Sequence, residues 1–511
     1  MPILSRRSIG SVACLLLLLL CRNEALGETA PSFRWADKIT WYPILAGYGM
    51  ALDDCGNVYL SGLIFSTFSF GNTTFDQQGM LLAKCDRAGN LLWAVRDGTN
   101  GATGIGLGLD GAQNIYVLVS SHGQEMTLAG STVTGDVLLA KYDQNGHGLW
   151  AKAIVPAGYS LSPIPFALSV DPAGNSYWSF FFSGDMTFGP TNVTAAGNSG
   201  ALVKCDSAGD VRWVRVVASP PGDLLFPGTP GIDSAGHVYL PGHFHLGASF
   251  GTTNLTPAPG ATGESSFLAK YNDEGDLLWV RQSGPGGNVG SDRLTIDPQG
   301  NCLVQIYFDN VASFGGLVLS NSVPTNYQGI VKYSADGEAL WAVQGCQSST
   351  RATLATDAAG NCYFESECGD GSTFFAKYDP AGNTAWTRSG PPLTVLGLRT
   401  DALGYCYALG QLTTNTTSFD STVLSGVNPN NGVYLAKLDT TTAPPLNIAV
   451  SNGFVTLSWP VIADGFYLQS RCDFNSGEWT SNSIPSQIIG SLQQLTVPAA
   501  GPSRFFRLKR D

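Results

Sequence analysis

The apolar positions of the chain fall into short runs that are joined by polar turns containing glycine. The stretch Leu81–Arg96 reads LLAKCDRAGNLLWAVR, with two apolar runs on either side of the turn 86–90. Two short apolar runs joined by a few residues with glycine near the end predict a β-hairpin with a bulged turn. Gly89 supplies the positive φ that such a turn needs, and Asp86 can accept hydrogen bonds from the turn amides.

This hairpin recurs six more times along the chain, and the last copy is cut short. One lysine and one tryptophan mark each complete copy. The lysines are Lys84, Lys141, Lys204, Lys270, Lys332, Lys377 and Lys437, and the tryptophans are Trp93, Trp150, Trp213, Trp279, Trp341 and Trp386. Successive lysines are 57, 63, 66, 62, 45 and 60 residues apart. Internal repeats of this length indicate an array of similar structural units.

A second hairpin alternates with the first, and its first copy spans Met50–Leu60. Its aspartates are Asp53, Asp110, Asp171, Asp233, Asp297, Asp357 and Asp401. Each repeat therefore holds four short strands, with a longer loop between the second and the third. Four strands in about 60 residues are typical of one blade of a β-propeller.

The two ends of the repeat region complement each other. Phe33–Ala36 matches a fourth strand without the preceding three, and Tyr434–Asp439 matches a third strand with no fourth strand after it. Pairing of these two segments would remove the open sheet edges. The sequence therefore predicts an all-β fold, a seven-bladed β-propeller over residues 28–440 that is closed by its N-terminal strand.

The repeat resembles the SBBP repeat, the seven-bladed propeller repeat of secreted bacterial proteins. The matching motifs are Asp-x-x-Gly-Asn-x-Tyr at Asp53–Tyr59 and Leu-Ala-Lys-x-Asp-x-x-Gly-Asn-x-x-Trp at Leu82–Trp93. The sixth repeat departs from the family, because its loop between the second and third strands is nearly deleted. The resemblance implies a propeller fold and an exported location, but a fold alone does not imply an activity. A weaker resemblance is to quinoprotein propellers, which have eight blades and cofactor and calcium ligands that we cannot place here.

The first 27 residues have the features of a signal peptide. Arg6 and Arg7 precede the apolar run Val12–Leu20, and Ala25–Gly27 is a cleavage site of small residues. The apolar run is too short to span a membrane. Ordinary secretion, export by the twin-arginine route and a lipoprotein anchored at Cys21 stay open, with the first favoured. The sequence therefore predicts a secreted, periplasmic or cell-surface protein without a transmembrane span.

A second, smaller domain follows the linker 441–445. Residues 446–511 contain short segments that alternate apolar and polar residues, which predicts a small antiparallel β-sandwich. The clearest of them is Phe454–Trp459, which reads FVTLSW. The segment resembles the fibronectin-type-III-like modules at the ends of many exported bacterial proteins.

The net charge of the chain restricts the classes of molecule that it can bind. Without residues 1–27 the chain holds 24 basic and 38 acidic residues, a net charge of −14. This excess of acidic residues argues against binding to nucleic acid or to anionic membranes.

Cys302, Cys362 and Cys406 share one strand position in successive repeats. Stacked sheets lie about 10 Å apart, too far for disulfides between these positions, so buried thiols are predicted. Cys346 and Cys368 flank the short sixth repeat and are candidates for a disulfide.

The regular rings of lysine, aspartate and tryptophan are predicted to be structural. A binding site would use one or two repeats, whereas these residues recur in all or nearly all of them. A lysine within an apolar strand needs a partner, and the aspartates of the repeat are the obvious ones. The sequence contains no recognisable catalytic motif, so no catalytic residue is assigned.

Binding is predicted in the long loops between second and third strands, because loops on a rigid scaffold usually carry function. The candidate residues are Phe65, Phe68, Phe182, His243, Phe244, His245 and Tyr307. His243 and His245 alternate on a strand and are candidate metal ligands, with His122 at a similar place in the second repeat. No third ligand can be named, so neither a metal nor another cofactor is expected.

The favoured hypothesis is therefore a monomeric, non-enzymatic scaffold that binds a polysaccharide or a cell-surface protein. The alternative is a propeller enzyme, either polysaccharide-active or a quinoprotein-like oxidoreductase. The enzyme hypothesis predicts that carboxylates, histidine or tyrosine cluster on the loop face of a few repeats.

Overall fold

The computed structural model of the chain contains only β-strands, turns and irregular segments among the residues it describes. These are 31–39, 49–64, 67–70, 73–98, 102–159, 168–258, 261, 263–321, 325–348, 352–401, 404–414, 416–425, 432–439, 446–451, 454–460, 466–471, 480–481, 486–490, 492–498 and 505–510. Within these residues no helix has the length and apolar character needed to cross a membrane. Two compact units are present, of which the larger is Ala30–Thr440 and the smaller contains Thr441–Asp511.

In the residues that the structure describes, the larger unit contains seven antiparallel sheets of four or five strands, besides five two-stranded hairpins. The first three are β2 (Gly49–Leu52), β3 (Val58–Ile64), β6 (Gly79–Cys85) and β7 (Leu91–Asp97); β8 (Thr103–Leu109), β9 (Ile115–Ser120), β12 (Val137–Tyr142) and β13 (Gly148–Val155); and β14 (Leu168–Val170), β15 (Ser176–Phe188), β16 (Thr191–Cys205) and β17 (Val211–Val217). The fourth and fifth are β18 (Leu225–Pro227), β19 (Gly231–Ile232), β20 (Val238–Phe244), β23 (Ser265–Tyr271) and β24 (Leu277–Gln282); and β25 (Val289–Ile296), β26 (Cys302–Phe308), β29 (Tyr327–Tyr333) and β30 (Ala339–Gln347). The last two are β31 (Ala352–Thr356), β32 (Cys362–Glu367), β33 (Thr373–Tyr378) and β34 (Thr384–Gly390); and β35 (Leu393–Thr400), β36 (Cys406–Leu412), β39 (Gly432–Leu438) and β1 (Phe33–Ile39).

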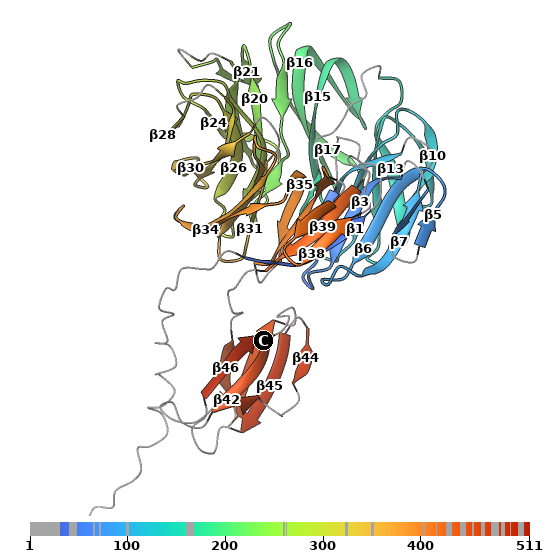
Figure 1. The fold of residues 1–511 in the computed structure, drawn as a ribbon. Helices are drawn as coiled ribbons and strands as arrows, with labels where there is room; N and C mark the ends of the chain where they lie inside the picture. The colour runs from blue at the N-terminus through green and yellow to red at the C-terminus, as the bar shows by residue number, and fades with distance from the viewer. Residues whose placement is uncertain are drawn as a thin grey trace, which may run out of the picture. The chain divides into compact units, whose positions relative to one another are not determined.

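The seventh sheet joins the two ends of this unit. Strand β1 pairs antiparallel with β39, and Figure 1 shows the two strands side by side. Trp35 lies opposite Lys437 in this pair, as Trp93 lies opposite Lys84 in the first sheet. The first strands of successive sheets also contact one another in series, from β2 through β8, β14, β19, β25 and β31 to β35, and β35 contacts β2.

The repeat aspartates hold the turn between the first and second strands. Asp53 accepts hydrogen bonds at Oδ1 from the backbone nitrogens of Cys55 (3.0 Å) and Asn57 (2.9 Å). Its Oδ2 accepts from the side-chain amide of Asn57 at 2.8 Å. The same arrangement recurs at Asp110, Asp297 and Asp357. An aspartate that caps its own turn in this way is a local device, which explains why it repeats.

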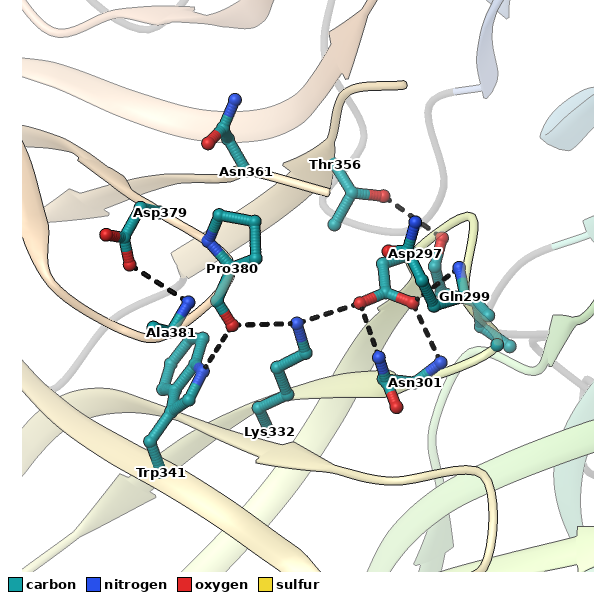
Figure 2. A network of polar contacts seen from close by, with 12 residues as sticks. Asp297, Gln299, Asn301, Lys332, Trp341, Thr356, Asn361, Asp379, Pro380 and Ala381 are labelled. Carbon is teal, nitrogen blue, oxygen red and sulfur yellow. Dashed lines mark hydrogen bonds and ion pairs between the residues drawn. The ribbon is translucent and has the colours of Figure 1, made fainter. Parts of the chain in front are cut away.

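The repeat lysines link each sheet to its own turn and to the next sheet. Figure 2 shows Lys332 of β29 between the carboxylate of Asp297 (2.8 Å) and the carbonyl oxygen of Pro380 (3.1 Å). Pro380 belongs to the turn before β34, in the neighbouring sheet, and its carbonyl also accepts from Nε1 of Trp341 at 3.1 Å. Lys84 and Lys141 form ion pairs with their own aspartates at 3.3 and 3.2 Å. The structural role predicted for the lysines and aspartates is confirmed.

The repeat tryptophans pack between neighbouring sheets. The ring of Trp93 lies under Gly146 in the turn of the second sheet, where a Cβ would come within 2.9 Å of the ring. Gly146 has a φ of 83°, so both the contact and the backbone require glycine. Trp150 contacts Gly209 of the third sheet in the same way, and a Cβ there would lie 2.6 Å from the ring. The packing role predicted for these tryptophans is therefore confirmed.

Most of the long connections between second and third strands contain short strands of their own. Five of them contain a two-stranded hairpin, and in the third sheet β15 and β16 themselves extend into one. The hairpins are β4 (Phe68–Phe70) with β5 (Thr73–Phe75), β10 (Glu125–Leu128) with β11 (Ser131–Thr134), β21 (Ala248–Phe250) with β22 (Thr253–Leu255), β27 (Val311–Phe314) with β28 (Leu317–Ser320), and β37 (Thr416–Phe419) with β38 (Thr422–Ser425). Phe188, Phe250 and Phe314 are buried, and each is followed by a turn glycine with positive φ, so this recurring Phe-Gly pair is part of the fold.

A disulfide joins Cys346 on β30 to Cys368 in the short turn before β33, as the sequence suggested. It connects the fifth sheet to the sixth, in which the connection between the second and third strands is short. Cys302, Cys362 and Cys406 are buried and free, which confirms the prediction for these thiols.

Replacing both Cys346 and Cys368 by serine is expected to lower the free energy of unfolding by about 3 kcal/mol, because the bond closes a loop of 22 residues. Urea denaturation of the full chain measures this loss. Replacing Cys55, an exposed free thiol, by serine is the control and should change stability little. Equal stability of the double variant and the control would contradict the expectation.

The described residues of the smaller unit form two antiparallel sheets. One consists of β40 (Asn447–Ser451), β41 (Phe454–Pro460), β45 (Leu492–Pro498) and β44 (Gln487–Ile489), and the other of β43 (Thr480–Ser481), β42 (Phe466–Arg471) and β46 (Phe505–Arg510). Leu457 and Leu495 of the first sheet and Leu468 of the second are buried. The predicted signal peptide 1–27 and the linker 441–445 lie outside the described residues.

Candidate functional site

One strand position of the larger unit does not follow the repeat. It lies four residues after the second-strand residue that pairs with the repeat lysine, near the end where the hairpin connections begin. In sheet order this position holds Leu63, Ser120, Phe181, His243, Tyr307, Glu367 and Gln411. Side chains that recur in every sheet maintain the fold, so those that break the pattern are the better candidates for binding or catalysis.

Four aromatic rings form a row across the third, fourth and fifth sheets. Phe181 contacts Phe226 of β18 with ring centroids 5.8 Å apart. Phe226 stacks on His243 at 5.1 Å, and His243 meets Tyr307 edge-on at 5.7 Å. Phe181, Phe226 and Tyr307 are partly exposed, whereas His243 is buried.

His243 lies between a phenol, a backbone carbonyl and two carboxylates. Its Nε2 is 3.2 Å from the hydroxyl of Tyr307 and 3.8 Å from Oε1 of Glu264. Its Nδ1 is 3.4 Å from the carbonyl oxygen of Ser291 and 3.7 Å from Oδ1 of Asp292. The tautomer decides the donor: a proton on Nε2 can be donated to the phenol oxygen of Tyr307, whereas a proton on Nδ1 can be donated to the carbonyl oxygen of Ser291.

Tyr307 donates a hydrogen bond to Oε2 of Glu264 at 2.9 Å. Burial raises the pKa of Tyr307, and the negative charges of Asp292 and Glu264 raise it further. The phenol therefore stays protonated and is a hydrogen-bond donor at neutral pH. Glu264 precedes β23, and its side chain is 27% exposed, so a ligand on this face can reach the carboxylate.

A β-bulge holds Asp292 of this cluster and the next residue, Arg293. The pairing of β25 with β26 shifts between Ser291 and Leu294, which leaves Asp292 and Arg293 out of the ladder. A bulge re-aims side chains in this way. The side chain of Arg293 reaches the seventh sheet, where it donates to the carbonyl oxygen of Leu396 at 2.8 Å. The backbone oxygen of Asp292 accepts from the nitrogen of Thr229 at 2.7 Å.

A buried carboxyl group lies on the sixth sheet. Glu365 of β32 is fully buried, and burial raises its pKa to about 8 although Tyr434 donates a hydrogen bond to it and Arg293 lies near. Its Oε2 has no hydrogen-bond partner. The residue is therefore largely a neutral acid at pH 7.

The structure brings together two of the predicted binding residues, His243 and Tyr307. Phe182 and Phe244 pack in the hydrophobic core and are inaccessible in this structure. His245 is exposed in the bend after β20, and Phe68 lies on β4. Phe65 lies outside the described residues. A role in binding stays a prediction for all seven.

His243 is buried and His245 is exposed, so the structure gives no support to the pairing of these residues at a metal. Within the described part of the chain no group of three or more His, Cys, Asp or Glu side chains is arranged to hold a metal ion. The proposed match of His122 with His243 is also corrected. His122 lies in a turn with a φ of 52°, two residues beyond the strand position equivalent to His243.

Sequence reasoning missed Phe226, Glu264, Asp292 and Arg293. None of them belongs to a motif, and they lie on three different segments, which are β18, the connection before β23 and the bulge of β25. A position-by-position comparison of the seven second strands would have singled out Phe181, His243 and Tyr307. The carboxylates carry no such signal, because Glu264 lies in a connection and Asp292 in a bulge.

Comparisons with known proteins give only remote likenesses. No family model matches the chain, and no curated protein matches it. Solved structures that are similar include the Dos1 propeller, with a TM-score of 0.36 and 9% identity over 78% of this chain and 92% of that chain. They also include a PL25 ulvan lyase bound to -[GlcA(1-4)Rha3S]-, with a TM-score of 0.37 and 11% identity over 73% and 93% of the two chains. An intramolecular trans-sialidase from Ruminococcus gnavus has a TM-score of 0.37 and 10% identity over 81% and 98%. The resemblances to the SBBP repeat and to fibronectin-type-III-like modules stay predictions.

Proposed function

We propose that the chain is an exported β-propeller of seven blades that binds a polysaccharide, without catalysis, on the face where its hairpin connections lie. The seven sheets of the larger unit, the pairing of β1 with β39 and the serial contacts of the first strands support a closed ring. The two sheets of the smaller unit support a sandwich module. Export rests on the predicted signal peptide 1–27.

One observation carries the binding proposal, which is the row of rings from Phe181 to Tyr307 with Glu264 beside it. Exposed aromatic rings stack on the apolar faces of sugar rings, while carboxylates, phenols and imidazoles exchange hydrogen bonds with sugar hydroxyls. A few polar groups beside apolar rings are typical of small-molecule sites. The row breaks the sevenfold repeat, as a ligand site should.

Replacing Tyr307 by phenylalanine is expected to weaken glycan binding about tenfold, because the hydroxyl that joins Glu264 and His243 is lost while the ring stays. Isothermal titration of the full chain with the glycan that most raises its thermal midpoint measures the change. Replacing Tyr467 of the smaller unit by phenylalanine is the matched control. Equal binding by both variants would contradict the assignment of the site.

The alternative function, a polysaccharide-active propeller enzyme, is favoured by one specific observation. Nε2 of His243 lies 3.2 Å from the phenol oxygen of Tyr307, which in turn donates to Glu264, and such a chain of three groups can move a proton to or from a substrate. New reducing ends released by the wild type but not by the Tyr307→Phe variant would establish the enzyme. Binding without any release would establish the scaffold. No observation favours the quinoprotein alternative.

A further inference from the structure

The charges on the first strands of the seven sheets are confined to one sector. Among the described strands β2, β8, β14, β18, β19, β25, β31 and β35, only β25 and β35 carry charged residues. These are Asp292, Arg293 and Arg399. The first strands of the other sheets consist of apolar residues, glycine, proline, serine and threonine. Two guanidinium groups in such surroundings need an explanation.

Arg399 is a cation without a counter-charge among the described residues. Its side chain is exposed and donates to the carbonyl oxygen of Leu398 at 2.8 Å. No carboxylate in the described residues forms an ion pair with it. Surrounding protein lowers the pKa of its guanidinium by desolvation. A guanidinium group without a carboxylate partner can donate its remaining N–H groups to a bound anion.

Arg293 brings a second guanidinium group to the same strand. It donates to the carbonyl oxygen of Leu396, two residues before the carbonyl that Arg399 uses. Leu396 lies in a β-bulge of β35, where the pairing with β36 shifts between Val395 and Gly397. Both guanidinium groups therefore bind carbonyl groups within three residues of one strand, and an oxyanion that reaches both can accept charge-assisted hydrogen bonds from each. Strand β35 ends its sheet, so no further strand of that sheet covers its other edge.

We propose that Arg399 and Arg293 form an anion-binding site at the open edge of β35, and that it takes a carboxylate or sulfate group of an acidic polysaccharide. The inference rests on the proposed binding function and names its ligand class. Arg293 follows Asp292, which lies 3.7 Å from His243, so the bulge of β25 contributes one residue to the row of rings and the next to the anion site. A bound glycan then places neutral sugar faces on the rings and its acidic group between the arginines.

The test is isothermal titration of the full chain with three probes at low ionic strength. These are a uronic-acid oligosaccharide, its uncharged methyl ester and inorganic sulfate. The acidic oligosaccharide is expected to bind at least tenfold more tightly than its ester. Arg399→Gln should remove that preference, and Arg399→Lys should keep part of it. Arg212→Gln, at an exposed ion pair with Asp206 on the third sheet, is the matched control and should bind like the wild type.

The outcomes separate the anion site from the binding function. The anion site would be overturned if the acid and the ester bound equally and Arg399→Gln changed neither affinity. If Tyr307→Phe weakened binding in that case, the binding function would still stand. If sulfate binds, the acidic oligosaccharide does not, and Arg399→Gln abolishes the binding of sulfate, the anion site would be supported. Its ligand would then be a free anion and not a polysaccharide. Thermal unfolding of Arg399→Gln should match the wild type or exceed it, because an uncompensated charge is removed. Loss of folding in both Arg399 variants would also overturn the assignment, since it would make the residue structural.

Discussion

Replacing Lys332 by methionine is expected to lower the free energy of unfolding by about 3–5 kcal/mol. The side chains of Lys332 and Asp297 are 3% and 0% exposed and lie 2.8 Å apart. Removal of one partner of a buried ion pair leaves an uncompensated charge in the interior. The carbonyl oxygen of Pro380 also loses a donor, and with it one link between the fifth and sixth sheets (Figure 2). Urea denaturation of the full chain at pH 7 measures the loss.

The pH dependence of this loss identifies its cause. Burial by itself would raise the pKa of Asp297, but hydrogen bonds from Lys332 and Asn301 outweigh burial and hold the pKa below its ordinary value. A carboxylate with a lowered pKa contributes stability that is present above the unfolded pKa and is lost as pH falls through the folded pKa. The difference between wild type and the Lys332→Met variant should therefore shrink below about pH 4.

The chain offers a matched control in an exposed ion pair. Lys152 lies 2.5 Å from Asp210, with side chains 39% and 63% exposed, and it also joins neighbouring sheets. Lys152→Met is expected to cost less than about 1 kcal/mol, because water and salt screen exposed pairs. A loss in Lys332→Met no larger than that of the control would refute the role of burial.

The parts of the fold that could be predicted from the sequence are those that depend on local contacts. Asp53 binds its own turn, and Lys84 and Trp93 lie one hairpin away from it in the chain. Each copy must satisfy the same local geometry, so the residues recur and the period can be read. The disulfide of Cys346 and Cys368 was suggested for a similar reason, since the shortened sixth repeat brings the two residues close together.

The candidate site could be predicted only in part, because it depends on contacts between repeats. His243 and Tyr307 were chosen as aromatic and histidine residues at the hairpin end of their strands. Phe182 and Phe244 have the same local pattern, but strand alternation turns their rings into the core. Glu264 and Asp292 reach the site from a connection and a bulge, and no periodic signal marks either position.

Replacing Glu365 by glutamine is expected to stabilise the protein at alkaline pH. Burial raises the pKa of Glu365 to about 8 in the folded chain, far above the ordinary value of 4.5. The folded state therefore holds a proton that the unfolded state releases between pH 4.5 and 8. Stability from this group is fully present below pH 4.5 and is lost as pH rises to 8, at about 1.4 kcal/mol for each pH unit. The total loss is on the order of 5 kcal/mol.

Urea denaturation of the wild type and the Glu365→Gln variant from pH 4.5 to 9 tests this expectation. The two should differ little at pH 4.5, because the amide has nearly the shape of the protonated acid, and the variant should be more stable by several kcal/mol at pH 8. Glu125→Gln, on the exposed surface of β10, is the control and should follow the wild type at every pH. Parallel stability curves for the wild type and Glu365→Gln would mean that Glu365 is ionised in the folded protein. The nearby charge of Arg293 would then outweigh burial, and a guanidinium group engaged in that way would compete with any anion at the edge of β35.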